Sequence, residues 1–287
     1  MGESEFRNVA TIEGKVKRRE FKDNVGNGLL EVYVDADGNS VKLQKWNTRN
    51  NPNAAQEFSD TFENGGKYRF QGNLSERLNE GTFYREVRAW NTVTELGEND
   101  DERAVLSLAG DVLDINMKYA QPEEVKGIQY EGEVVPVIEM KILYFNTYNP
   151  DNSNEELSRE ATLMRELKNY KDYAEKNNIA YNDNLKNWYD TLQSIGGMEN
   201  VLDIYEKFKK TSANLFNINE LTVVAYGELA EQIAGEVERG DNLLLGIFIE
   251  NKFSGVQYDE FGSPVSGSDQ GGESYNRLRV GKYEILE

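Results

Sequence analysis

Cysteine and histidine are both absent from this sequence of 287 residues. Without cysteine the chain forms no disulfide, iron–sulfur cluster or thiolate zinc site, which fits a cytoplasmic protein. Without histidine it lacks the usual general base, the serine triad and nearly all zinc or haem ligation. Catalysis therefore has no positive support in the residues, and the sequence predicts neither a catalytic site nor a cofactor or metal.

Long apolar runs are also missing. No stretch of 18 apolar residues occurs, so no membrane span is predicted, and the N-terminal MGESEFRN lacks the apolar core of a signal peptide. Gly281-Lys282 has neither the upstream glycine nor the following Ser or Thr of a phosphate-binding loop. The 51 acidic residues leave a carboxylate nuclease open as the weakest hypothesis, because chance proximity among so many acids identifies no pair.

Negative charge is concentrated in the second half of the chain. Residues 1–96 hold 14 basic and 15 acidic residues, whereas 97–287 hold 18 basic and 36 acidic ones, within a total net charge of -19. The local field at a binding site matters more than the whole-molecule charge. The acidic half either keeps the protein soluble or repels a polyanion from every surface except its site.

The first half alternates apolar and polar residues with the period of β-strands. This pattern turns Val32 and Leu43 inward and leaves Glu13, Glu31 and Trp46 outward. Asp37-Gly38 is a hairpin signal, and the polar segment 75–81 is expected to be a loop. The expected strands cover residues 9–21, 29–36, 40–46, 67–74 and 82–93, with a helix between the third and the fourth.

A strand–helix–strand unit occurs twice, at Ser40–Leu74 and at Glu220–Phe253. In each copy an aromatic residue ends the strand, two apolar residues four apart share a helix face, and a glycine follows that can end the helix. The matched pairs are Trp46 with Tyr226, Phe58 with Ile233, Phe62 with Val237, and Gly65 with Gly240. Because Ile12–Val16 also matches Leu108–Val112, the sequence predicts a duplicated domain.

Both units resemble the core of the bacterial single-stranded-DNA-binding protein family, which is built on the OB-fold. YRFQGNL at 68–74 is similar to the family's fourth-strand pattern, and VVAYGELAE at 223–231 to the junction where an aromatic ring stacks on a base. The resemblance covers about residues 8–95 well, and 104–116 with 219–286 moderately. It implies that Trp46 and Tyr226 are stacking residues.

The fold expected from this resemblance is mainly β with an α insertion: two five-stranded Greek-key OB barrels, the second interrupted by a helical subdomain. The first OB-fold covers 1–96, an acidic linker 97–103, and the second OB-fold 104–287 with its helical insertion at about 150–218. Residues 262–274 are expected to form a mobile loop. The cluster Asp100, Asp101 and Glu102 is interpreted as solvated linker, with a metal site as the alternative.

Cations that follow phosphates and rings that stack on bases are what single-stranded nucleic acid requires. The first half carries both on one set of strands. An alternative for Tyr84 and Trp90 is that they cap the barrel against the second domain. The predicted nucleic-acid-binding residues are Lys15, Lys17, Arg18, Arg19, Tyr33, Lys42, Lys45, Trp46, Arg49, Arg69, Arg77, Tyr84, Arg88, Trp90 and Tyr226.

The function expected is non-catalytic coating and protection of single-stranded DNA in replication or recombination, with RNA left open. The chain resembles compact acidic proteins of large bacterial viruses, which places it in the host cytoplasm. It ends in YEILE and lacks the family's acidic tail with terminal Pro-Phe. Two barrels in one chain predict a monomer, and replication or recombination proteins are expected partners of the insertion or the acidic half. The alternative is an OB-fold scaffold that binds a host or viral protein.

Overall fold

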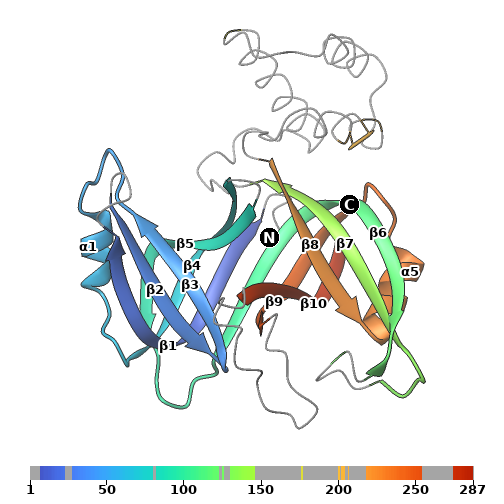
Figure 1. The fold of residues 1–287 in the computed structure, drawn as a ribbon, viewed down its shortest axis with the longest axis horizontal. Coiled ribbons are helices and arrows are strands. Elements are labelled where there is room, and N and C mark those ends of the chain that lie inside the picture. Colours follow the sequence, from blue (N-terminus) through green and yellow to red (C-terminus); the bar gives the residue numbers. More distant parts are fainter. Residues whose placement is uncertain are drawn as a thin grey trace, which may run out of the picture. The chain divides into compact units, whose positions relative to one another are not determined.

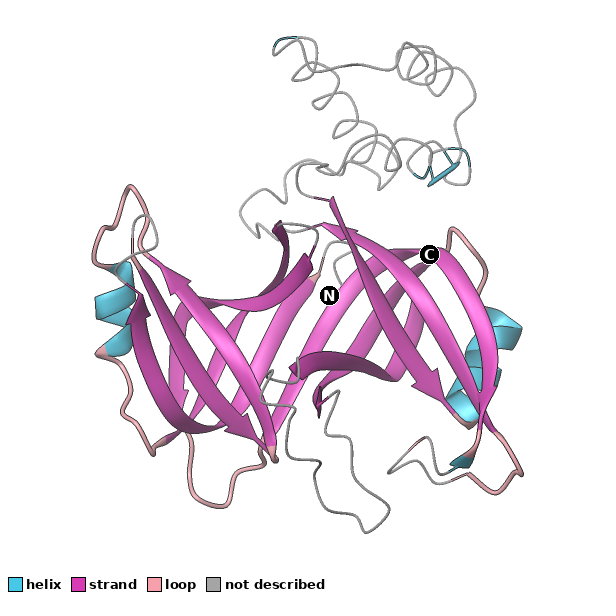
Figure 2. Ribbon diagram, in the orientation of Figure 1, coloured by secondary structure: helices cyan, strands magenta, loops and turns pink. Residues whose placement is uncertain are grey.

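The computed structural model describes residues 7–22, 28–79, 82–122, 125, 130–145, 176, 200, 202–203, 206, 218–253 and 274–286. Strands dominate these residues, so the protein is mainly β as the sequence predicts (Figure 2). The predicted helical insertion, apart from a few positions, and the loop at 262–273 lie outside the described residues. No helix in the described part is long and apolar enough to cross a membrane.

In the described part of the chain, ten strands and the helices α1 and α5 follow one another in two similar series (Figure 1). The first series is β1 (Asn8–Lys22), β2 (Leu29–Ala36), β3 (Asn39–Trp46), α1 (Ala54–Ser59), β4 (Lys67–Asn79) and β5 (Thr82–Glu95). The second is β6 (Arg103–Ala120), β7 (Val135–Phe145), β8 (Ile218–Tyr226), α5 (Glu228–Glu236), β9 (Asn242–Phe253) and β10 (Ser274–Leu286). In both, the helix follows the third strand.

Strand pairing has the same order in the two series. β1 pairs with β2, β2 with β3, β3 with β5, β5 with β4, and β4 with β1 again. The second series repeats this order as β6, β7, β8, β10, β9 and back to β6. β3 and β5 run parallel, whereas β1–β2, β2–β3, β1–β4 and β4–β5 are antiparallel. By its contacts the chain divides into two compact units, residues 9–107 with 246–282, and residues 1–8 and 108–245 with 283–287.

The repeat extends to individual backbone hydrogen bonds. Val16 exchanges two with the turn Gly65-Gly66, at 2.8 and 2.9 Å, and Val112 exchanges two of the same lengths with Gly240-Asp241. Gly65 and Gly240 both adopt positive φ, 88° and 95°, a conformation that glycine reaches without steric cost. The matched glycines therefore hold the same position in both copies of the unit.

The turn between β2 and β3 sets the register on which the candidate site depends. Asp37 and Gly38 both have positive φ, 53° and 76°, and the Gly38 N–H donates to the Asp35 carboxylate at 2.9 Å. A two-residue turn of this kind matches the twist of an antiparallel pair. It places Ala36 opposite Asn39, which confirms the predicted hairpin.

Two expectations for the first half are wrong in their boundaries. The helix is shorter than predicted: α1 ends at Ser59, so Phe62 lies beyond it, yet the Phe58 and Phe62 rings still meet edge to face at 5.3 Å between centroids. The expected loop at 75–81 is mostly strand, because β4 runs to Asn79 and β5 starts at Thr82 in register. Backbone pairing holds a hairpin together regardless of side-chain polarity, so the polar composition was a poor guide.

The predicted acidic linker is a turn held by Lys67. Its ammonium pairs with the Glu102 carboxylate at 3.2 Å and donates to the backbone carbonyls of Glu98 and Asp100. The Asp100 carboxylate accepts the Gly97 N–H at 2.7 Å. In the described part of the chain, no three acidic side chains lie close enough together to hold a metal ion.

Glu13 was expected to face solvent, but its side chain is buried at 3% exposure. Its two carboxylate oxygens accept hydrogen bonds from Arg69 and Arg103, both at 2.5 Å. Two guanidinium groups cover the carboxylate, and strand periodicity gives no sign of this. Burial raises the pKa of Glu13, but the hydrogen bonds and charges of Arg69 and Arg103 outweigh burial and leave the pKa below its ordinary value.

Glu13→Gln is expected to lower the free energy of unfolding by about 1–2 kcal/mol near neutral pH, because it removes charge-assisted hydrogen bonds whose arginines are partly solvated. Because the pKa of Glu13 is lowered in the folded protein, this stabilisation is fully present at pH values above the ordinary pKa of 4.5. It is lost as the pH falls through the pKa of Glu13 in the folded state. Urea unfolding from about pH 7 to pH 3 should therefore show the two proteins converging. Glu63→Gln, at an exposed position, is the control. A difference that does not change with pH would contradict this account of Glu13.

Candidate functional site

The outer side of β1, β2 and β3 gathers cations and aromatic rings in a regular grid. It lies opposite the buried Val32, Val34 and Leu43. Three cross-strand rows form this surface, here called the β1–β3 face: Arg18, Tyr33 and Lys42; then Glu20, Glu31 and Gln44; then Lys22, Leu29 and Trp46. Residues opposite each other on adjacent strands are close enough to interact, so each row is a set of direct neighbours.

A β-bulge brings two successive cations of β1 toward the same surface. The register with β2 shifts between Val16 and Arg18. Lys17 then pairs with Asp35 at 2.8 Å, while the Arg18 guanidinium lies over the Tyr33 ring, 4.1 Å from its centroid. Bulges re-aim side chains in this way, and strict alternation would have sent Lys17 and Arg18 to opposite sides.

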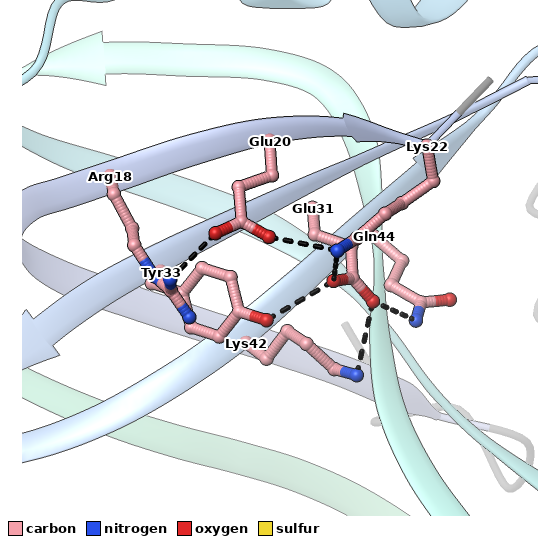
Figure 3. Close-up of polar contacts among 7 residues, drawn as sticks. All are labelled: Arg18, Glu20, Lys22, Glu31, Tyr33, Lys42 and Gln44. Atoms are coloured by element: carbon pink, nitrogen blue, oxygen red, sulfur yellow. Dashed lines mark hydrogen bonds and ion pairs between the residues drawn. The ribbon is translucent and has the colours of Figure 1, made fainter.

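Glu31 is the centre of the β1–β3 face (Figure 3). The residue is 8% exposed, and its carboxylate accepts hydrogen bonds from Lys42 at 3.2 Å, Gln44 at 3.3 Å and the Tyr33 hydroxyl at 3.1 Å. Gln44 in turn accepts the indole N–H of Trp46 at 3.1 Å. One carboxylate thus fixes Tyr33 directly and Trp46 through Gln44. Burial and the neighbouring Glu31 raise the pKa of Tyr33, which stays a neutral donor.

Glu20 bridges the two cations of β1. It accepts from Arg18 at 2.6 Å and from Lys22 at 2.9 Å, and Lys22 also lies 3.9 Å from Glu31 (Figure 3). The face therefore carries mixed charge, with acids between the cations. The predicted site residues are cations and rings only and include none of these acids.

Lys45, one of the predicted site residues, points away from this face. Lys45 lies opposite the buried Leu30, on the same side as Leu43, and donates to the Ala89 carbonyl at 3.0 Å. Its ammonium lies 5.4 Å from the centroid of the Phe58 ring, and burial lowers the pKa of Lys45. The alternation that turns Leu43 inward also turns Lys45 inward, which the prediction overlooked.

Arg19 and Arg69 hold the fold together rather than lying among the cations of the face. Arg19 lies opposite Val32 and donates to the carbonyl of Ser59, the last residue of α1, at 2.6 Å and to that of Phe62 at 3.1 Å. Helix ends leave carbonyls that need such donors. Arg69 is the partner of Glu13 described above.

The other predicted residues are dispersed. Lys15 and Arg49 are exposed and make no ion pair within the described residues, and Trp90 is half-buried on β5. Arg88 is exposed opposite Gln44 on the parallel strand, at the margin of the β1–β3 face. The backbones of Arg77 and Tyr84 are in register across β4 and β5. Tyr226 ends β8.

The second series has a matching surface with different charges, here called the β6–β8 face. Its bulge lies between Val112 and Asp114, the counterpart of the bulge in β1. The corresponding rows are Asp114, Lys141 and Thr222; then Asn116, Glu139 and Val224; then Lys118, Val137 and Tyr226. Tyr226 stands where Trp46 does. Lys141 pairs with Asp114 at 3.2 Å and Lys118 with Glu139 at 3.3 Å, so its named charges balance.

Five residues of the β1–β3 face were not among the predicted site residues: Glu20, Lys22, Leu29, Glu31 and Gln44. Lys22 was missed because the expected strand stopped at Phe21, whereas β1 continues to Lys22. Continuing the alternation from Arg18 would have placed Glu20 and Lys22 on the same surface. Gln44 is polar and outward by alternation, but its part in holding Trp46 depends on contacts.

No family model matches the chain, and no curated protein matches its sequence. Among solved structures, wild-type single-stranded DNA binding protein from Thermus aquaticus aligns over 99% of this chain and 95% of its own, with a TM-score of 0.51 and 13% identity. A deletion mutant of that protein aligns over 98% of this chain and 95% of its own, with a TM-score of 0.49 and 14% identity. At this identity the likeness concerns the fold, and it runs through the whole chain.

Glu31→Ala is expected to lower the free energy of unfolding by about 1–3 kcal/mol, because it removes the acceptor shared by Lys42, Gln44 and Tyr33. Glu139→Ala is the matched control, since Glu139 holds the corresponding position with a 39% exposed side chain paired to Lys118. It should cost less than about 1 kcal/mol. Urea unfolding followed by circular dichroism compares the two. Equal losses would show that Glu31 has no special role.

Proposed function

We propose that this protein binds single-stranded DNA on the β1–β3 face, without catalysis. The observation that carries the proposal is the placement of two oriented rings, Tyr33 and Trp46, among Arg18, Lys22 and Lys42 on one surface. Single-strand binding combines aromatic platforms for bases with cations along the backbone. The fold similarity to a protein described as a single-stranded DNA binding protein supports the same conclusion.

The architecture we propose is two OB barrels in one chain. The two identical orders of strand pairing, the parallel contact of β3 with β5 and the helix after the third strand support it. In this scheme 1–96 form the first OB-fold, 97–103 the linker, and 104–287 the second OB-fold with a helical insertion at about 150–218. OB-folds use the surface of their second and third strands for oligonucleotides, which corresponds to the β1–β3 face.

Preorganisation is the contribution of Glu31 to binding. A ring that already has its bound orientation loses less conformational entropy when a base stacks on it. Tyr33 is held by its hydroxyl and Trp46 by its indole N–H, so both can stack with little rearrangement. Each stacked base is worth about 1–3 kcal/mol, enough for two rings to supply much of a modest affinity.

The distribution of charge favours binding of single-stranded DNA to the first half of the chain. The β1–β3 face has three named cations against Glu20 and Glu31, and Arg88 adds another at its margin. On the β6–β8 face the acids equal the cations, and Asp114 replaces Arg18. A polyanion therefore meets less repulsion on the first surface. The acidic second half then prevents nonspecific binding elsewhere.

The biological role we propose is to coat and protect single strands during replication or recombination, in a bacterial virus and its host's cytoplasm. The chain would act as a monomer, and the insertion or the acidic half would contact other replication or recombination proteins. The resemblance of 68–74 and 223–231 to the bacterial family supports this assignment. RNA shares the stacking and phosphate chemistry, so it belongs in the same binding assays.

Trp46→Ala is expected to weaken binding of a labelled oligothymidylate by about 1–3 kcal/mol, because a base loses its stacking platform. Tyr226→Ala, at the corresponding position of the β6–β8 face, is the matched control and should change affinity much less. Trp46→Phe removes the hydrogen bond to Gln44 but keeps a ring, so it should retain most of the affinity. Fluorescence anisotropy measures all four proteins at one salt concentration, since affinity depends on salt.

Thermal unfolding of the same variants separates binding from stability. If Trp46→Ala binds normally but melts early, the ring is structural and the β1–β3 face is not the site. If Tyr226→Ala lowers the affinity for oligothymidylate more than Trp46→Ala does, the DNA binds the second half of the chain. If the wild-type protein binds no oligonucleotide even at low salt, the scaffold alternative replaces the proposed function.

A further inference from the structure

Glu20 occupies a position between two cations that a phosphate group could fill. Arg18, Glu20 and Lys22 follow one another at alternate positions of β1, so all three side chains lie on the β1–β3 face. One Glu20 oxygen accepts from Arg18 at 2.6 Å and the other from Lys22 at 2.9 Å (Figure 3). A phosphodiester also presents two anionic oxygens, and guanidinium and ammonium groups bind both anions through charge-assisted hydrogen bonds.

We propose that Arg18 and Lys22 form a subsite for a backbone phosphate of the bound strand, and that Glu20 holds this subsite closed in the free protein. The inference rests on the proposed function and adds to it a named phosphate contact and its internal competitor. A phosphate that enters the subsite binds both Arg18 and Lys22, and the displaced Glu20 side chain rotates into solvent. Binding at this position is thus an exchange of one anion for another.

Glu20 can leave its partners more easily than the other acids of the face. Its side chain is about a third exposed and interacts with Arg18 and Lys22 alone among the contacts described. Glu31 is buried and holds Lys42, Gln44 and Tyr33, so moving it would break the support of both rings. Glu20 is therefore the movable anion and Glu31 the fixed one.

The position of the subsite suits a strand that also stacks on the rings. The Arg18 guanidinium lies over Tyr33, so a phosphate held by Arg18 is adjacent to the ring on which a base would stack. Lys22 is in the row of Trp46, the other ring of the face. The subsite thus joins the two stacking positions along β1.

The second series lacks this arrangement. Asp114, Asn116 and Lys118 stand where Arg18, Glu20 and Lys22 do, so one cation is replaced by an acid and the bridging acid by an amide. A hydrogen bond from Lys22 and the nearby Arg18 hold the pKa of Glu20 below its ordinary value, so it is ionised at neutral pH and competes with phosphate. The closed subsite is a property of the first half.

The test is Glu20→Gln against Glu63→Gln, which makes the same change of net charge at an exposed position of the first half. Glu20→Gln should bind a labelled oligothymidylate about 3- to 10-fold more tightly at low salt, because phosphate no longer displaces an anion. Its affinity should also fall more steeply with salt, by up to about 0.7 in the log–log slope, the value of one phosphate contact on a single strand. Glu63→Gln should bind like the wild-type protein.

The double variant Glu20→Gln/Lys22→Ala is the second test. It should lose both the higher affinity and the steeper salt dependence expected for Glu20→Gln. Melting curves should be unchanged for Glu20→Gln, because the side chains it releases are exposed. If the wild-type protein binds and the affinity of Glu20→Gln equals that of the wild-type protein or of Glu63→Gln, the proposed subsite is wrong. The proposed function is unaffected by that result. A gain that survives in the double variant also overturns the subsite. If neither the wild-type protein nor Glu20→Gln binds at low salt, both proposals fail.

Discussion

The β1–β3 face depends on a nearly buried carboxylate, that of Glu31, and on the donors gathered around it. Such a group is costly unless it is hydrogen-bonded, and here Lys42, Gln44 and Tyr33 supply the bonds. These hydrogen bonds orient the donors, and Gln44 in turn accepts the indole N–H of Trp46. Without this acid the same strands would carry mobile cations and loosely held rings.

The two series share one backbone framework and differ in the residues on its surface. The two series share their pairing order, their bulges after Val16 and Val112, and the turns at Gly65 and Gly240. Backbone geometry is thus kept, while Arg18 is matched by Asp114 and Trp46 by Tyr226. The halves of the chain can therefore have one architecture and different affinities for a polyanion.

The fold was largely predictable because strand periodicity, the Asp37-Gly38 turn and the repeated glycines are local signals. The side-chain contacts were less predictable, because they join residues distant in sequence: Arg69 and Arg103 bind Glu13 in the fold, and Lys42 binds Glu31 in the candidate site. Parity identified Trp46 and Lys42 as outward and would have excluded Lys45 had it been applied to every residue. Parity does not exclude Arg19, because only the bulge in β1 turns Arg18 outward and Arg19 inward. The bulge that re-aims Arg18 leaves no sign in the local pattern.

We propose that single-stranded DNA lies on the β1–β3 face. Ultraviolet cross-linking of the full chain to oligothymidylate, followed by peptide mapping, tests it most directly, because aromatic residues stacked on bases cross-link efficiently. We expect cross-links within residues 29–46, which contain Tyr33 and Trp46, and strong competition by unlabelled single strands but not by duplex. Cross-links confined to residues outside β1–β5, or equal competition by duplex, would contradict the account.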